Sequence, residues 1–132
     1  MTDASTRKRP RNLDLPSLIF YRLPLPGKLS ILHRVSGLGL FLLLGPLLWL
    51  FQLSVTSPEA FATFRELASC GVAKVIFAGL IWAFAHHFCA GIRFLFLDAH
   101  VGLEKESARN SAIAVFVVSI LITVTLIWGI LL

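Results

Sequence analysis

Three long segments of this 132-residue chain contain no Asp, Glu, Lys or Arg, and they restrict what the chain can fold into. These segments are residues 35–58, 75–92 and 111–132. About 20 apolar residues in a helix span the hydrocarbon core of a bilayer. The middle segment gains length from residues 94–97, because Arg93 can extend its charged end towards the headgroups. The sequence therefore predicts an all-α integral membrane protein with three transmembrane helices, at about 30–54, 72–98 and 109–131.

The overall composition agrees with a membrane protein. Hydrophobic residues make up 57% of the chain and charged residues 14%, whereas about a quarter of the residues in a soluble domain are charged. The first apolar segment is too long for a cleaved signal and follows a polar leader. We therefore expect a transmembrane domain over residues 30–132, preceded by a cytoplasmic leader and interfacial segment over residues 1–29. In that leader, the aromatic rings of Phe20 and Tyr21 are expected at headgroup level.

Lysine and arginine are distributed unevenly around the predicted helices. Of the 12 such residues, only Arg65 and Lys74 lie in the first loop region, up to the start of the second helix. The others precede or enter the first helix, or flank the loop at 99–110. The positive-inside rule therefore places the N-terminus and this loop on the cytoplasmic side of a bacterial inner membrane. This anchoring accounts for the net charge of +5, so no nucleic-acid partner is needed to explain it.

The second apolar segment contains two adjacent histidines, His86 and His87. Steps of four along a helix place His87 on one stripe with the small residues Gly79, Ala83 and Gly91. Small residues let another body approach the backbone, and that body can be a partner helix or a flat macrocycle. Because imidazole is a common axial ligand of haem iron, His87 is a candidate ligand; a helix-packing face with an interhelical hydrogen bond is the alternative. We expect His86, on a bulkier stripe, to be a hydrogen-bonding neighbour.

A second polar cluster, Ser30, His33 and Arg34, stands at the start of the first predicted helix. At 1.5 Å per residue, Arg34 lies roughly 6 Å below the cytoplasmic boundary and His87 roughly 16 Å below it. This offset makes His33 a poor second iron ligand. The same offset in depth would place His33 near the propionates of a haem at His87. Arg34 and Arg93 are the expected charge partners for those carboxylates. Ordinary interfacial anchoring is the alternative for these basic residues.

Other polar residues carry weaker signals. Asp98, at the cytoplasmic end of the second helix, either takes part in proton uptake near a redox site or marks the helix end and pairs with a nearby arginine, and we favour the second interpretation. His100 is expected to be a solvated loop residue. Cys70 and Cys89 are about 28 Å apart along a helix, so they cannot pair. No C-x-x-C-H motif is present, which excludes covalent c-type haem attachment.

Three motifs together resemble one known family. They are Arg9-Pro10-Arg11-Asn12-Leu13-Asp14-Leu15, Ser30-Ile31-Leu32-His33-Arg34-Val35-Ser36-Gly37, and His87-x-x-x-Gly91-Ile92-Arg93 with Asp98. In this order, and over nearly the whole chain, they are similar to the cytochrome b subunit of succinate dehydrogenase. That subunit is one of the two membrane anchors of respiratory complex II. Each of the last two motifs is weak alone, but together they are specific.

The resemblance implies a haem b site. His87 matches the family's axial ligand, and the second axial histidine would come from the other anchor subunit. His33 matches the histidine near the haem propionates, and Gly91 and Arg93 belong to the same haem motif. Two departures stand out. Many members have histidine where this chain has Phe94, so propionate pairing would depend more on His33 and Arg34.

The second departure is His86, which replaces an aromatic residue common in relatives and stays open as an alternative iron ligand. The resemblance also implies a ubiquinone site. The family's quinone-site serine and arginine match Ser30 and Arg34. Ile31 is expected to line that site beside Ser30, and Asp98 is a candidate for proton delivery.

The implied activity belongs to a larger complex. In this family, succinate is oxidised in a flavoprotein subunit, and electrons pass through an iron–sulfur subunit to ubiquinone at the membrane. This chain would supply part of the quinone pocket and half of the haem site, and it would be inactive alone. Two alternatives remain at this point, an anchor of a quinol:fumarate reductase and a cofactor-free membrane scaffold.

Overall fold

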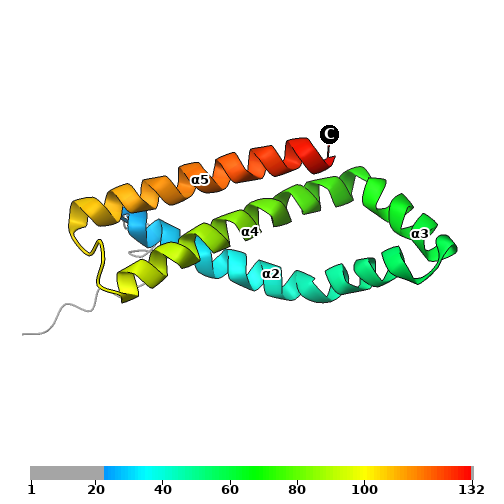
Figure 1. The fold of residues 1–132 in the computed structure, drawn as a ribbon, viewed down its shortest axis with the longest axis horizontal. Helices are drawn as coiled ribbons and strands as arrows, with labels where there is room; N and C mark the ends of the chain where they lie inside the picture. The colour runs from blue at the N-terminus through cyan, green and yellow to red at the C-terminus, as the bar shows by residue number, and fades with distance from the viewer. Residues whose placement is uncertain (1–22, 132) are drawn as a thin grey trace, which may run out of the picture.

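The computed structural model describes residues 23–131 of the chain. This part folds into four helices with no strand (Figure 1). They are α2 (Leu25–Thr56), α3 (Pro58–Ser69), α4 (Gly71–Asp98) and α5 (Lys105–Leu131). The predicted interfacial position of Phe20 and Tyr21 lies outside the described residues.

The three long helices confirm the predicted membrane spans. Each of α2, α4 and α5 is long and apolar enough to cross a bilayer. Helix α2 begins at Leu25, before the predicted start, and includes Pro26 and Gly27. Proline is tolerated in the first turn, because the N–H that it lacks would have no partner within the helix. These two residues therefore lie in the first span, and not in an interfacial segment over residues 1–29 as predicted.

Helix α3 is an element that the sequence analysis did not predict. Its first turn is capped by Ser57, whose hydroxyl oxygen accepts a hydrogen bond from the Ala60 N–H at 3.1 Å. Pro58 occupies the first helical position, which suits proline. A backbone hydrogen bond and the Ser57 hydroxyl hold the pKa of Glu59 below its usual value. The helix is amphipathic, and none of its residues is buried.

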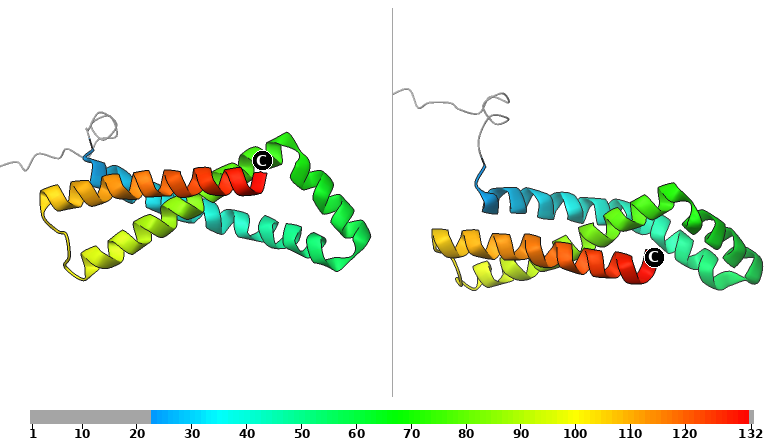
Figure 2. Two further views of the ribbon diagram at one scale, coloured as in Figure 1. Left: turned by 45° about the horizontal axis from the view of Figure 1, so that its top comes forward. Right: turned by 90° about the horizontal axis from the view of Figure 1, so that it is seen from above.

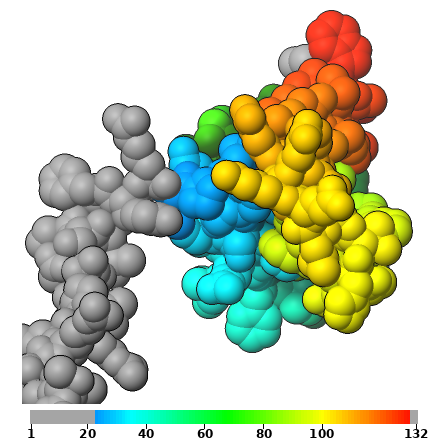
Figure 3. Space-filling model, turned by 90° about the vertical axis from the view of Figure 1, so that its left-hand side faces the viewer, coloured from blue at the N-terminus to red at the C-terminus, as the bar shows by residue number. Residues whose placement is uncertain are grey.

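The helices form an open arrangement rather than a closed bundle. Helices α4 and α5 run side by side in opposite directions, and α2 crosses α4 (Figures 1 and 2). Beyond the crossing, α2 and α4 diverge, and α3 bridges their far ends. At the other end, seen in Figure 3, the start of α2 lies against the start of α5.

The buried core is small and lies near the end where the starts of α2 and α5 meet. It consists of one large side chain from α2 packed among small and medium residues of α4 and α5. The members are Leu29, Ala90, Ala112 and Val115. Small residues at such contacts let helix backbones approach closely. The core therefore holds α2, α4 and α5 together at the level where the predicted polar sites begin.

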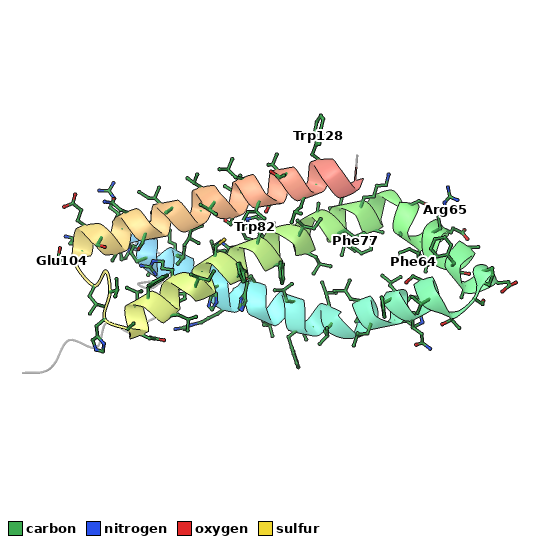
Figure 4. The ribbon with its side chains drawn as sticks, in the orientation of Figure 1. Phe64, Arg65, Phe77, Trp82, Glu104 and Trp128 are labelled. Atoms are coloured by element: carbon green, nitrogen blue, oxygen red, sulfur yellow. The ribbon has the colours of Figure 1, made fainter. Side chains whose placement is uncertain are left out.

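Most of the apolar surface remains uncovered. Phe41, Val75 and Trp128 are each more than 70% exposed, and Trp128 points away from the other helices (Figure 4). Apolar surface on this scale is unfavourable in water but is expected in contact with lipid or with partner helices. The structure therefore agrees with the membrane assignment.

Candidate functional site

The histidines at 33 and 87 form a stacked pair between α2 and α4. Their ring centroids are 4.1 Å apart, and the ring planes differ by 9°. Both side chains are half-buried. His33 comes from the third turn of α2 and His87 from the middle of α4. The structure thus brings together two residues that the sequence analysis placed in one site.

A hydrogen bond fixes the orientation of the His87 ring. Its Nδ1 lies 3.0 Å from the backbone carbonyl oxygen of His33. A carbonyl oxygen can only accept, so this bond requires Nδ1 to carry the proton. In a neutral imidazole, Nε2 is then the nitrogen with the free lone pair, and neutral imidazole is the form that binds a metal. No hydrogen bond to Nε2 forms within residues 23–131.

Ser36 extends this arrangement on α2. Its hydroxyl donates to the same His33 carbonyl at 2.9 Å and lies 3.3 Å from Nδ1 of His87. Ser36 is buried, with 5% of its surface exposed. The sequence analysis quoted Ser36 within a motif but gave it no role. Its position three residues after His33, on the same helix face, was the available signal.

One glycine, Gly37, allows the helices to come this close, and a second, Gly91, lies nearby. A Cβ at Gly37 would lie 2.7 Å from Cε1 of His87, closer than real contacts permit. A Cβ at Gly91 would lie 3.7 Å from Nε2 of His33, an ordinary contact distance. Gly79, at the other end of the predicted small-residue stripe, has nothing nearby within 4 Å. The part of the stripe around His87 and Gly91 therefore packs on α2, whereas the part around Gly79 faces the region where α2 and α4 diverge.

His86 points to the other side of α4, towards α5. It is fully buried, stacks on Trp82 with ring centroids 5.3 Å apart, and meets Phe116 at 5.4 Å. Neither ring nitrogen has a hydrogen-bond partner among the described residues. The expected hydrogen bond is therefore not seen among the described residues, where the side chain is surrounded by aromatic groups instead of polar ones.

Arg93 also turns towards α5. Its Nε donates to the Ser111 hydroxyl at 2.9 Å, and Nη2 donates to the Ala108 carbonyl at 3.1 Å. The side chain is 7% exposed. Phe94 lies between this arginine and the histidine pair, 5.5 Å from the Arg93 guanidinium and 5.0 Å from the His33 ring. These contacts join α4 to α5, so a role for Arg93 at a haem carboxylate stays a prediction.

The predicted quinone-site residues lie around the start of α2 and the end of α4. Ser30 is half-buried, whereas Ile31 and Arg34 are exposed, because the neighbouring Leu29 turns into the core. Asp98 is the exposed last residue of α4. Within residues 23–131, no hydrogen bond or ion pair links Asp98 to Ser30 or Arg34. The expected pairing of Asp98 with an arginine is thus not seen among these residues.

No complete metal site is formed by the described part of the chain. Residues 23–131 contain no group of three or more His, Cys, Asp or Glu side chains that could hold a metal ion. A metal bound at His87 would therefore need ligands from elsewhere, such as a macrocycle and a second chain. The free Nε2 on a half-buried ring fits a single axial ligand of this kind.

These features define a three-span membrane protein with an imidazole that is held by hydrogen bonds between two of its helices. Comparison of sequences gives the family. The model of the succinate dehydrogenase/fumarate reductase transmembrane subunit family matches residues 5–126, and the chain belongs to this family.

Curated relatives cover almost the whole chain. The succinate dehydrogenase cytochrome b556 subunit of Paracoccus denitrificans is 38% identical over 94% of this chain and 93% of its own length. The protein of the same name from Rickettsia prowazekii is 34% identical over 92% of this chain and 91% of its own length. That of Coxiella burnetii is 37% identical over 85% and 88%, respectively. The resemblance drawn from the three motifs is therefore confirmed.

Proposed function

We propose that this chain is the haem b- and ubiquinone-binding membrane anchor of a succinate:quinone oxidoreductase, with His87 as an axial ligand of the haem iron. The observation that carries the proposal is the hydrogen bond from Nδ1 of His87 to the His33 carbonyl at 3.0 Å. Metal-binding histidines typically donate their second N–H to an oxygen in this way, which fixes the tautomer and increases ligand basicity. The haem would supply a one-electron redox centre.

The surroundings of His87 suit a haem shared with another subunit. Residues 23–131 contain no group of three or more His, Cys, Asp or Glu side chains that could hold a metal ion, and three helices cannot enclose a macrocycle by themselves. The second axial imidazole would come from the other anchor subunit. The exposed apolar faces of α2 and α4 provide surface on which that subunit and the macrocycle can pack.

Basic residues near the start of α2 suit the haem carboxylates. His33 stacks on His87, and Arg34 follows it with an exposed guanidinium. Arginine binds carboxylates through charge-assisted, often bidentate, hydrogen bonds. Gly91 on α4 faces His33, and a Cβ there would lie 3.7 Å from Nε2 of that ring. Arg93 would need to keep its bonds to α5 while reaching a carboxylate with its remaining donors.

The quinone would bind at the exposed start of α2. In this proposal the Ser30 hydroxyl donates a hydrogen bond to a quinone oxygen, and Arg34 stabilises negative charge as that oxygen is reduced. Fixed donors of this kind act strongly where water is excluded. Ile31, which is 47% exposed, would contact the apolar part of the quinone. Asp98 would deliver protons from the cytoplasmic side through water.

The remaining subunits would perform the succinate chemistry. The proposed partners are a flavoprotein, an iron–sulfur subunit and a second membrane anchor, with the N-terminus of this chain on the cytoplasmic side of a bacterial inner membrane. The matched family includes fumarate reductase subunits, but the curated relatives described above carry succinate dehydrogenase names. These names favour succinate oxidation over the reverse reaction.

Substitutions at Arg34 and Ser30 test the proposal. In the purified complex, Arg34→Leu and Ser30→Ala should each lower succinate-dependent ubiquinone reduction by about 100-fold, since each removes one polar group at the reacting oxygen. Reduction of an artificial dye by the soluble subunits should not change. Lys28→Leu, another exposed cation in the first turns of α2, is the control. Unchanged ubiquinone reduction in both variants would overturn the quinone assignment.

A further inference from the structure

A large apolar cavity lies between the histidine pair and the α3 end of the molecule. Its volume is about 920 Å³, within the range of small-molecule sites. It is lined by residues of α2, α3 and α4 and by one residue near the end of α5. Phe64 of α3 and Phe77 of α4, both labelled in Figure 4, are among the lining side chains.

The cavity arises from the paths of the helices. Helices α2 and α4 diverge beyond their crossing, and α3 joins their ends (Figures 1 and 2). Along α4 the lining runs from Lys74 to Phe84, which is about 15 Å of helix. Lys74 is in the first turn of α4, so the cavity extends from the end of a membrane span towards its middle. These dimensions suit a hydrocarbon chain.

Two cations stand among the lining residues of this apolar space. They are Arg65 on α3 and Lys74 on α4, and the lining contains no acidic residue. Neither forms an ion pair within residues 23–131. Arg65 also lines a smaller cavity beside Glu66, which is its nearest acidic neighbour in sequence. Together they are the only Lys or Arg residues between Arg34 and Arg93.

We propose that this cavity binds an anionic phospholipid, with one acyl chain between α2 and α4 and the phosphate at Arg65 and Lys74. The two cations lie near the start of α4. Apart from them and Ser69, all the residues that line the cavity are apolar. This order of charge and hydrocarbon matches a phospholipid. A neutral quinone does not call for two cations, and an apolar partner helix leaves both of them unpaired.

The position of Trp128 supports placing the lipid headgroup at the membrane surface. This residue lies near the end of α5, at the same end of the molecule as α3 (Figure 4). Its side chain is 74% exposed, and exposed tryptophans concentrate at the membrane–water interface. The proposal is independent of the haem and quinone sites, which lie towards the other end of α2 and α4.

Lipid binding to the delipidated, purified complex tests the proposal. Phosphatidylglycerol and phosphatidylcholine carrying a spin label on the acyl chain serve as probes. The double variant Arg65→Gln, Lys74→Gln should weaken phosphatidylglycerol binding by about 30-fold, given the contribution of each cation near a membrane surface. Binding of phosphatidylcholine should change little. The control, Lys105→Gln with Arg109→Gln, removes the same charge at the other end of the molecule and should leave both affinities unchanged.

A second variant probes the apolar part of the cavity. Ala68 lines it from α3, so Ala68→Phe should occupy space and reduce the binding of both probes. The variant Ala68→Cys provides the competing test. Its crosslinking to a partner subunit in the intact complex would mean that protein fills the cavity, and this would overturn the proposal. Equal phosphatidylglycerol affinity in the wild type and the Arg65/Lys74 variant would overturn it as well.

Discussion

The carbonyl oxygen of His33 on α2 accepts a hydrogen bond from Nδ1 of His87 on α4, at 3.0 Å. This bond crosses between two membrane-spanning helices and leaves Nε2 of His87 as the nitrogen with a free lone pair. The stacking of the two rings holds the imidazole plane nearly parallel to that of His33. One helix thus sets both the tautomer and the orientation of the residue that we propose as the iron ligand.

Gly37→Ala tests the close packing behind His87. The new Cβ would lie 2.7 Å from Cε1 of the ring, so the ring or the helix must move. We expect the haem to stay bound with an altered electron paramagnetic resonance spectrum, because the ligand orientation changes. Gly39→Ala on the same helix, where nothing lies within 4 Å, is the matched control. Identical spectra for both variants would contradict the packing described here.

Ser36→Ala tests the polar support of the ligand. The substitution removes the hydroxyl that shares the His33 carbonyl with His87. Groups that support a ligand in this way typically affect metal affinity by 10- to 100-fold, and we expect about tenfold weaker haem retention during purification, measured as haem per complex. Ser54→Ala removes an exposed hydroxyl that bonds only the α2 backbone and should retain haem fully. Equal haem content in the Ser36 and Ser54 variants would show that Ser36 does not support the ligand.

Arg93 and Ser111 should act as a coupled pair that joins α4 to α5. Hydrogen bonds to charged groups contribute about 1.5–3 kcal/mol each, so Arg93→Ala and Ser111→Ala should each lower the thermal stability of the complex. The double variant should lose less than the two single effects combined, because both remove the same bond. Additive losses, measured by thermal unfolding in detergent, would mean that the bond contributes little.

His86→Phe should raise the thermal stability of the complex. Both ring nitrogens of His86 are buried without a partner among the described residues, and an unsatisfied buried polar group costs about 1–3 kcal/mol. Phenylalanine keeps the aromatic contacts with Trp82 and Phe116 while removing the polar atoms. Lower stability of the variant would indicate that another subunit or water satisfies His86 in the complex.

The membrane spans were predictable from sequence, but helix α3 was missed. Placing a charged side chain in the hydrocarbon core is unfavourable, so membrane spans are long segments without charge. Such segments identified α2, α4 and α5. Helix α3 is short and amphipathic, so a search for apolar segments does not detect it. The sequence Ser57-Pro58-Glu59, with a capping residue followed by proline and an acidic residue, was a helix-start signal that could have found it.

The histidine pair was only partly predictable. The small-residue stripe correctly indicated that another body approaches the backbone at His87, and in this chain α2 itself packs there. Arg93 and His86 face α5 because of the way α4 is rotated about its axis relative to α2 and α5. Hydrophobic periodicity cannot supply that rotation for a helix that is apolar on nearly all sides.

The reduced-minus-oxidised absorbance spectrum of the purified complex tests the central claim, that His87 is the haem ligand, most directly. His87→Ala should abolish or strongly alter the b-type signal, whereas His86→Ala, which changes the adjacent residue on the α5 side, should retain it. A normal signal in the His87 variant, or no haem signal in the wild type, would contradict the account.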